Sequence, residues 1–466
     1  MAEARAKFLT GNLFAHISVM ASTFSIGLMA VFAVDFIDMI FIAMLGKEEL
    51  AAAVGYAAAI LFFNTSFGIG MAIAAGALVA RALGEGNTAQ AEARKTHALA
   101  YGAIFGVCFA AVVWTQLPWL VTLLGARGET AELALSYLRI TVPALPFLMI
   151  GIIGGAILRA HGDARRAMMS TIWGGLVNAV LDPILIFGFG LELTGAALAS
   201  VAANIAIAVT ALRPIMRFYG GLGRPQLGPM LRDLGPILAI AAPAILTQIA
   251  TPVGQAIVTR AMAQFGEAAV AGMAIVGRLT PLAFAIIFAL SGAVGPILGQ
   301  NFGARDHARV RRGFNDAVLF TGIVIALVSA VLFALRGPIA DLFDASGVTR
   351  DLVFLFCGPL SLLFFFNGVL FVGNAAFNNM GRPFYSTFLN WGRNTLGMVP
   401  LVLGGAWLLG PSGVLIGQAL SGVIFGCIAW ALARRVMREA MAEAEPVAAS
   451  EFGRQGRLVS LFHLRR

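Results

Sequence analysis

The sequence predicts an all-α polytopic membrane protein, with twelve transmembrane helices in two pseudo-symmetric six-helix bundles around a central cavity. Three observations lead to this prediction. The chain of 466 residues is 59% hydrophobic and 12% charged, with a mean hydropathy of +0.87, far outside the range of soluble domains. Long apolar segments recur, each exceeding the roughly 20 residues that a helix needs to cross a bilayer. Motifs in the first half also return in the second half.

The apolar segments give the expected helices in order. They span residues 11–44, 50–80, 97–124, 130–158, 167–190, 194–218, 234–265, 268–300, 314–336, 348–378, 384–409 and 412–436. The first is interpreted as a membrane helix, because no small-residue cleavage site follows a short apolar core. The three cysteines are odd in number and lie inside apolar helices, and the five histidines form no cluster. We therefore expect no disulfide framework and no cluster of metal ligands. Separately, no cofactor and no enzymatic activity are expected.

The basic residues divide the loops into two sets. One side of the membrane receives Arg5, Lys7, Arg81, Arg94, Lys95, Arg159, Arg165, Arg166, Arg213, Arg217, Arg224, Arg232, Arg305, Arg309, Arg311, Arg312, Arg382, Arg434, Arg435 and Arg438. The other side receives only Lys47, Arg127, Arg336 and Arg350. By the positive-inside rule, both termini are expected to be cytoplasmic. We assign the protein to the plasma membrane (inner membrane) of a bacterium. The net charge of +9 follows from this topology, so no nucleic-acid partner is expected.

An internal repeat separates matching motifs by about 216 to 220 residues. Arg81-Ala-Leu-Gly84-Glu matches Gln300-Asn-Phe-Gly303-Ala, and Gly154-Gly-Ala-Ile-Leu158 matches Gly373-Asn-Ala-Ala-Phe377. Several matches in one order predict two halves of six helices, an arrangement suited to a rocking transporter. We divide the chain into an N-terminal bundle (1–218), a cytoplasmic linker (219–233), a C-terminal bundle (234–438) and a cytoplasmic tail (439–466).

Asp182 is the only ionisable residue between Ala167 and Gly190. A carboxylate inside the bilayer is costly unless it is paired, neutralised or exposed to a cavity, so its default interpretation is functional. Asn178 lies four residues earlier on the same helical face, and Pro183 loosens the helix beside it. Asp35 lies in the outer part of the first helix; for Asp38, one turn further out, a functional role and simple solvation both stay open.

With these motifs taken together, the chain resembles the multidrug and toxic compound extrusion (MATE) family. The resemblance rests on Asp35 ahead of Leu45-Gly46, on Arg81-Ala-Leu-Gly84-Glu and Leu158-Arg-Ala-His-Gly162-Asp, on Asn178-Ala-Val-Leu-Asp182-Pro183, and on Thr194-Gly-Ala-Ala-Leu-Ala-Ser200. It implies export of amphipathic, often cationic, organic compounds in exchange for H⁺ or Na⁺. It also implies that Asp35 and Asp182 handle the coupling cation, with polar help from Asn178 and Ser200.

Departures from the family pattern refine this expectation. Relatives of the NorM type carry acids in the C-terminal half, where this chain has Gln255 and Asn367. Coupling therefore looks confined to the N-terminal half, like the DinF-like branch. A polar position of that branch is Gly155 here, and the first helix lacks the proline that bends it in some relatives.

The substrate cavity is expected to be apolar and aromatic with a few polar anchors. The candidate anchors are Asn64, Gln248, Thr251, Gln255 and Asn367, each of which could equally form a hydrogen bond between helices. Small organic substrates, H⁺ or Na⁺ and membrane lipid are the expected partners of a monomeric protein. A lipid-linked saccharide flippase of the wider superfamily is the alternative, and an integral membrane enzyme is a more distant one.

Overall fold

The computed structural model describes residues 6–444, and all of its regular elements are helical. The first half contains η1 (Lys7–Leu9), α1 (Leu13–Met44), α2 (Glu48–Gly84), α3 (Thr88–Leu123), α4 (Gly128–Thr141), η2 (Val142–Ala144), α5 (Leu145–Ala160), α6 (Ala164–Pro183), η3 (Ile184–Gly188) and α7 (Glu192–Phe218). The second half contains α8 (Leu227–Ala263), α9 (Glu267–Ala283), α10 (Ala285–Gly303), α11 (His307–Leu342), α12 (Gly347–Leu355), η4 (Phe356–Leu360), α13 (Ser361–Asn379), α14 (Phe384–Asn394) and α15 (Met398–Ala444).

These elements make twelve membrane crossings. In the described part of the chain, 11 segments are long and apolar enough to span a membrane, and the last of them, Phe384–Ala442, has 59 residues. That length is far more than the roughly 20 residues of one crossing. The chain doubles back at Gly410, whose φ is 62°, so that Gly405 and Gly413 on either side of the turn are in close backbone contact. α15 therefore contributes to two antiparallel crossings, which confirms the predicted number.

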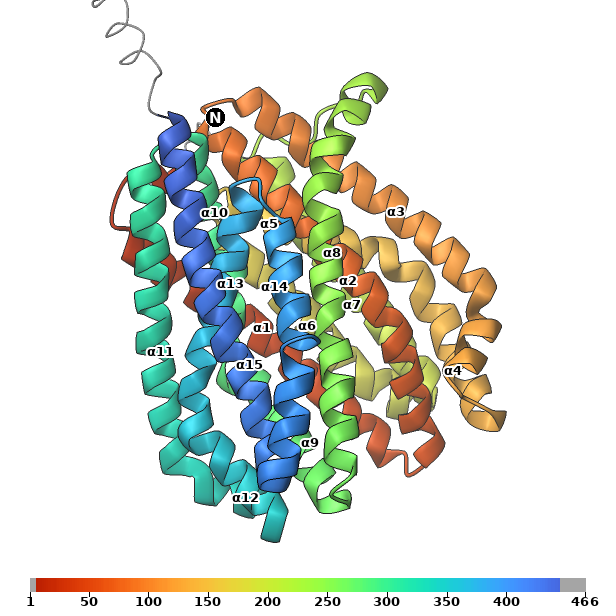
Figure 1. Cartoon of the computed structure of the whole chain (residues 1–466). Coiled ribbons are helices and arrows are strands. Elements are labelled where there is room, and N and C mark those ends of the chain that lie inside the picture. The colour runs from red at the N-terminus through yellow and green to blue at the C-terminus, as the bar shows by residue number, and fades with distance from the viewer. Residues whose placement is uncertain (1–5, 445–466) are drawn as a thin grey trace, which may run out of the picture.

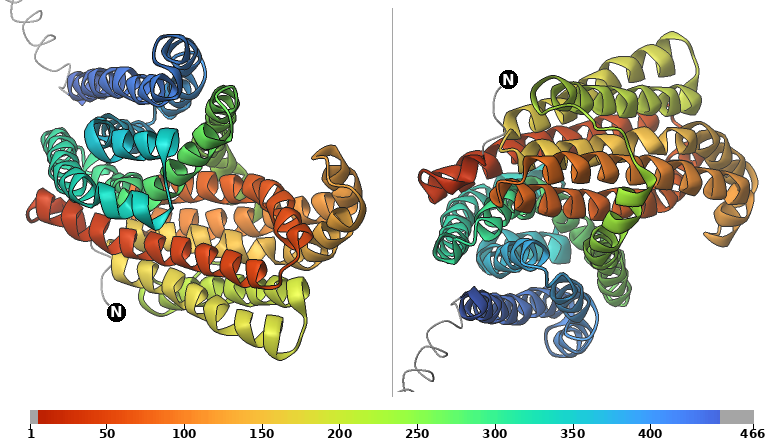
Figure 2. Two further views of the ribbon diagram at one scale, coloured as in Figure 1. Left: turned by 90° about the horizontal axis from the view of Figure 1, so that it is seen from below. Right: turned by 90° about the horizontal axis from the view of Figure 1, so that it is seen from above.

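The two halves of the chain lie on opposite sides of the molecule, with α1 between them. In Figure 1 the chain runs from red at the N-terminus to blue near its C-terminal end, and Figure 2 shows α1 between the yellow helices of the first half and the green helices of the second. α1 packs against α6 on one side and α10 on the other, while α2 packs against α8 and α10. α1 and α2 therefore carry much of the contact between the halves.

A reciprocal pair of glycines joins the halves at one end. Gly84 at the end of α2 lies against the backbone of Gln300 in α10, and Gly303 at the end of α10 lies against the backbone of Arg81 in α2. Positions 81 and 84 are the repeat partners of positions 300 and 303. A reciprocal contact between equivalent residues is what a pseudo-two-fold axis between two halves produces. A Cβ atom at either glycine would overlap the opposite backbone.

The N-terminal segment covers this same end. Phe8 is 1% exposed, and its N–H donates to Oε1 of Gln300 at 2.8 Å. Its carbonyl oxygen accepts from Asn301 Nδ2 at 3.2 Å and from Arg309 Nη2 at 3.0 Å. Lys7 Nζ donates to the carbonyl of Gly162 at 3.1 Å. This short segment therefore holds elements of both halves together, and we call this end of the molecule the closed end.

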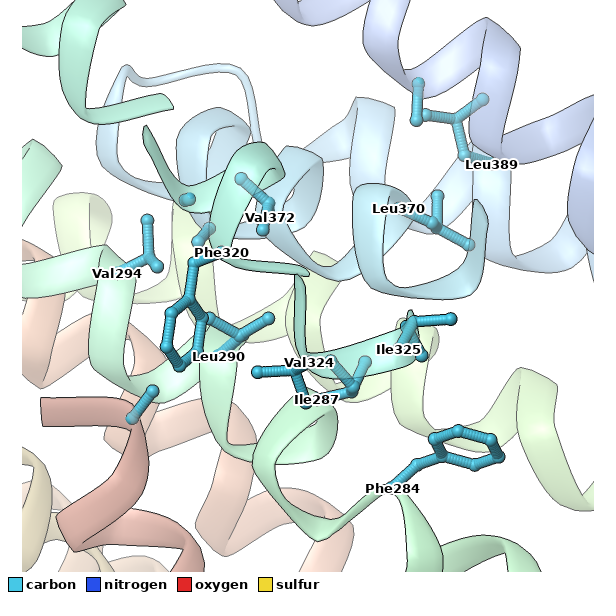
Figure 3. Packing of buried hydrophobic residues seen from close by; sticks show 14 of the residues in the cluster. Phe284, Ile287, Leu290, Val294, Phe320, Val324, Ile325, Leu370, Val372 and Leu389 are labelled. Atoms are coloured by element: carbon cyan, nitrogen blue, oxygen red, sulfur yellow. The ribbon is translucent and has the colours of Figure 1, made fainter. Parts of the chain in front are cut away.

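Apolar packing fills the interior of the second half. Figure 3 shows the cluster formed by Phe284, Ile287, Leu290, Val294, Phe320, Val324, Ile325, Leu370, Val372 and Leu389. These residues come from α10, α11, α13 and α14 and the turn before α10, and each is 8% exposed or less. In a bilayer such close packing, rather than exclusion from water, holds helices together. None of the side chains in this cluster is ionisable, so it supplies a rigid frame and no chemistry.

Residues 219–226 connect the halves and are fixed to the first of them. The hydroxyl of Tyr219 and the guanidinium of Arg166 both donate to Oδ2 of Asp163, each at 2.6 Å. Burial alone would raise the pKa of Asp163, but these hydrogen bonds outweigh it and hold that pKa below its usual value. His161 lies beside the Tyr219 ring, with centroids 4.5 Å apart, and burial together with Lys95 lowers its pKa to about 4.

Several helices extend beyond their predicted ends at the closed end. α3 begins at Thr88 rather than at residue 97, α8 at Leu227 rather than 234, and α11 at His307 rather than 314. Asn87 caps α3 by accepting from Gln90 N at 3.0 Å, and Asp306 caps α11 by accepting from Arg309 N at 2.9 Å. The hydropathy pattern missed these polar first turns, which side-chain capping stabilises outside the apolar span.

We expect Gly84→Leu to destabilise the protein by about 1–3 kcal/mol, because the added side chain has no space between α2 and α10. Thermal unfolding in detergent measures this change. Gly228→Leu is the matched control, since nothing lies within 4 Å of a Cβ at Gly228 in α8. Equal effects of the two substitutions would contradict close packing at the closed end.

We also expect the protein to lose stability as the pH falls from 6.5 to about 4, the ordinary and folded pKa values of His161. The unfolded chain binds a proton at His161 across this window while the folded protein does not, so unfolding becomes easier by on the order of 1–3 kcal/mol. Unfolding temperatures of wild type and His161→Phe between pH 7 and pH 4 test this. The variant should show a weaker pH dependence; an unchanged slope would assign the effect to other groups.

Candidate functional site

Small residues allow α1 and α6 to approach closely. A Cβ at Gly175 of α6 would lie 3.0 Å from Cγ2 of Val34, and one at Gly27 of α1 would lie 3.6 Å from Cα of Met168. Close approach of two backbones brings the polar side chains between them into direct contact. One turn beyond Gly175, α6 presents Asn178 and then Asp182 toward α1.

Asn178 joins two carboxyl groups from different helices. Its Nδ2 donates to Oδ1 and Oδ2 of Asp38 in α1, at 2.8 and 2.9 Å, and lies 3.1 Å from Oδ2 of Asp182. Asn178 is 4% exposed and Asp182 is 1% exposed. The Asp38 and Asp182 carboxyl groups are therefore neighbours, joined through one amide nitrogen. We call Asp38, Asn178 and Asp182 the acid cluster.

Hydrogen bonding between two carboxyl groups requires a proton. Two ionised carboxylates offer only acceptors, and in a low dielectric they repel one another strongly. The Oδ1 atom of Asp182 is buried without a hydrogen-bond partner in the described structure. An orphaned buried oxygen next to a second carboxyl group can bind a proton or a small cation at low cost. The acid cluster is therefore suited to taking up and releasing one positive charge.

The helix that carries Asp182 ends immediately after it. Pro183 has no backbone N–H, and α6 passes there into the π-helical turn η3. Widened turns of this kind are frequent at functional sites. Asp182 thus occupies a locally irregular position inside the membrane, as the sequence predicts.

Asp35 lies outside the hydrogen-bonded acid cluster. Its side chain is exposed, and among the described residues it makes no hydrogen bond to Asn178 or Asp182. Asp38 is the carboxyl group of α1 that contacts Asn178. The helical phase of α1 explains the difference: Asp38 is eleven residues, or about three turns, after Gly27, so both face α6. Asp35 points about 80° away from that line.

Ser200 belongs to a neighbouring pair. It lies on α7, half-buried, near the side chain of Tyr137 of α4. Tyr137 in turn is near enough to Asp35, Asp38 and Asp182 to feel their charges. No direct hydrogen bond joins Ser200 to the acid cluster in the described structure, so the structure adds Tyr137 between them.

Two of the candidate substrate anchors line a hollow. Thr251 and Gln255 of α8 border a cavity of about 840 Å³ together with Phe62 of α2 and Gly277 of α9. A volume of this size suits a drug-sized ligand. The lining residues 251–263 belong to the half of α8 that is remote from its first residue, Leu227, at the closed end, so this cavity lies away from the closed end.

The remaining anchors are buried apart from this cavity. Asn64 is 1% exposed and Asn367 is 6% exposed. Within residues 6–444, both side-chain polar atoms of Asn64 and the Oδ1 atom of Asn367, which lies beside Gly422, have no hydrogen-bond partner. Gln248 is half-buried, two turns before Gln255 in α8. In the part of the chain that the structure describes, no three His, Cys, Asp or Glu side chains are grouped to hold a metal ion.

Comparisons with known proteins bear on both the repeat and the fold. The MatE family model matches residues 24–184 and again residues 243–403, two segments that begin 219 residues apart. The predicted internal repeat is therefore confirmed. A solved structure of a multidrug resistance MATE family transporter in an outward-facing conformation superposes with a TM-score of 0.88 and 22% identity, over 93% of this chain and 98% of that chain. This likeness shows the shared fold.

Two curated relatives extend over most of the chain. The FAD transporter of Shewanella oneidensis is 27% identical over 88% of this chain and 92% of its own length. The multidrug export protein MepA of Staphylococcus aureus is 26% identical over 74% of this chain and 77% of its own length. Because the family model covers more than half of the sequence, the chain belongs to the MATE family of multi-pass membrane transporters.

Proposed function

We propose that this protein is a secondary antiporter that exports amphipathic organic compounds in exchange for H⁺ or Na⁺ by alternating access. The observation that carries the proposal is the buried Oδ1 atom of Asp182, which has no hydrogen-bond partner among the described residues, next to an amide shared with the Asp38 carboxyl group. The name of the relative MepA, a multidrug export protein, agrees with drug efflux. The members of the family are transporters, which argues against the membrane-enzyme alternative.

The acid cluster supplies the coupling step. When the site faces outward, a proton or Na⁺ enters and neutralises the charge shared by Asp38 and Asp182. Neutralisation relieves the repulsion between the two carboxyl groups, and the packing of α1 against α6 changes as a result. Because α1 also packs on α10, this change reaches the second half directly. In this proposal Asp35, Ser200 and Tyr137, which lie near the cluster, assist by orienting water or the cation.

The closed end and the cavity are the two faces of the alternating cycle. Reciprocal glycine contacts and the Phe8 hydrogen bonds seal one end, whereas the cavity lies away from that end. Opening the opposite face requires α2 and α10 to separate at Gly84 and Gly303. The bundles 1–218 and 234–438, joined by the linker, act as the two moving bodies in this proposal.

The proposed setting is the inner membrane of a bacterium, with both termini in the cytoplasm and the protein acting as a monomer. The closed end then faces the cytoplasm, in keeping with the basic loops there. The tail beyond residue 444 lies outside the described residues. A lipid-linked saccharide flippase is a weaker candidate, because only one arginine is among the residues lining the larger cavity.

We expect Asp38→Asn and Asp182→Asn to abolish gradient-driven transport, whereas Asp35→Asn keeps at least about half of it, because only the first two remove a member of the acid cluster. The measurement is uptake of ethidium, a cation, and of flavin mononucleotide, an anion, by everted vesicles under a proton or a sodium gradient. Full activity of both cluster variants with either gradient would refute the coupling role.

We expect Asn178→Ala to destabilise the protein by about 1–3 kcal/mol, because it removes the amide donor shared by two buried carboxyl groups. The loss should be larger at pH 8 than at pH 5, since protonation relieves the repulsion that the amide offsets. Asn394→Ala is the matched control: it is the repeat partner of Asn178, and its amide donates only to the carbonyl of Asn390 at 2.9 Å. A pH-independent loss in both variants would show ordinary packing instead.

A further inference from the structure

One side of α8 carries a polar stripe into the cavity. Thr251, Gln255 and Thr259 recur every four residues, and all three line the cavity of about 840 Å³. The Thr259 hydroxyl donates to the carbonyl of Gln255 at 2.9 Å, whereas the Gln255 side-chain amide has no partner in the described structure. An exposed stripe of this kind offers hydrogen bonds to a ligand rather than to another helix.

An apolar recess continues from this cavity. A second hollow of about 230 Å³ shares Gln255, Thr259 and Gly277 with the first and is otherwise lined by Met262, Val270, Met273 and Ala274. Methionine side chains adapt to apolar and aromatic groups of different shapes. The two connected hollows therefore present a polar face and an apolar face to one ligand.

The charge in these hollows is positive. Arg260 lines the larger cavity, and no carboxylate is among the residues lining either hollow. The ion pairs of the described residues do not include Arg260. A second guanidinium follows Gly277 on α9: that of Arg278, whose Nη2 lies 3.8 Å from the sulfur of Met39. The carboxyl groups of the acid cluster lie between α1 and α6 instead.

From this arrangement we propose that the ligand of the α8–α9 cavity is an amphipathic organic anion, whose phosphate or carboxylate binds Arg260 and whose apolar part enters the methionine-lined recess. An arginine is the residue best suited to bind such a group, because its planar guanidinium donates two parallel hydrogen bonds. The inference rests on the proposed transport function and narrows its substrate class. It departs from the cationic compounds that the family resemblance implies.

An anionic substrate also suits the energetics of export. With the cell interior negative, moving one negative charge outward releases about 2.3 kcal/mol per 100 mV. Entry of a proton or Na⁺ in exchange moves charge in the same electrical direction. The membrane potential therefore drives both halves of the cycle, whereas export of an organic cation would work against it.

The test is equilibrium binding of riboflavin and flavin mononucleotide to the full-length protein in phosphatidylcholine nanodiscs, followed by flavin fluorescence. The two probes differ by one phosphate. We expect flavin mononucleotide to bind at least about tenfold more tightly than riboflavin, and added salt to weaken only the phosphate-dependent part. Because no gradient is applied, loss of coupled transport does not affect this measurement, and failure of the two proposals can be told apart.

Three variants locate the effect. Arg260→Gln should remove most of the preference for the phosphate while leaving riboflavin binding unchanged, and Arg260→Lys should restore part of it. Arg336→Gln is the matched control, because Arg336 lies over the rings of Phe333 and Phe354 and does not line either hollow. The preference of Arg336→Gln for flavin mononucleotide over riboflavin should equal that of wild type.

The remaining outcomes overturn the proposal. Absence of flavin mononucleotide binding, equal binding of the two flavins, or an undiminished preference in Arg260→Gln each contradict it. Tighter binding of ethidium than of flavin mononucleotide would assign the cavity to cations. Repeating the titration with phosphatidylglycerol in the nanodiscs distinguishes a lipid headgroup: if that lipid abolishes binding at equal ionic strength, Arg260 serves as a lipid contact and not as a substrate anchor.

Discussion

The amide of Asn178 is the contact on which the functional interpretation depends, because it holds two acidic groups together inside a membrane. Without it, Asp38 and Asp182 would face each other in a low dielectric with little to offset their repulsion. The close approach of α1 and α6 at Gly27 and Gly175 makes the contact possible. The free-energy cost of burying two acidic groups is offset when one proton or cation neutralises the cluster. In the proposed mechanism the same property makes the cluster a switch.

In the proposed mechanism α1 transmits the state of the acid cluster, because it packs on both halves. It contacts α6 at the acid cluster, and it contacts α10, which belongs to the interface at the closed end. At that end glycines bring the backbones of α2 and α10 together, and Phe8 is held by hydrogen bonds to α10 and α11. Interfaces of this kind have discrete packed arrangements, so a small change at α1 favours one arrangement over another.

Much of the fold could be predicted from the sequence, because the hydropathy pattern and the internal repeat can both be recognised without knowing the structure. Twelve crossings and the matching of Gly84 with Gly303 followed directly, whereas polar first turns, such as that after Asn87, lay outside the apolar pattern. Within the site, Asn178 and Asp182 were paired correctly because they share one helix. To decide which of Asp35 and Asp38 faces α6, one must know how α1 is rotated about its axis relative to α6. Gly27 marks the side of α1 that faces α6, but only once the packing of the two helices is known. Tyr137 beside Ser200 was missed because it comes from a distant helix.

The central claim is that Asp38 and Asp182 share one exchangeable charge. Infrared difference spectroscopy of the protein in lipid, recorded between acidic and alkaline pH, detects the carbonyl stretch of a protonated carboxyl group directly. The account predicts a band from a buried carboxyl group that titrates in wild type and is lost or strongly shifted in both Asp38→Asn and Asp182→Asn, while Asp35→Asn retains it. The same titrating band in all three variants would contradict the account.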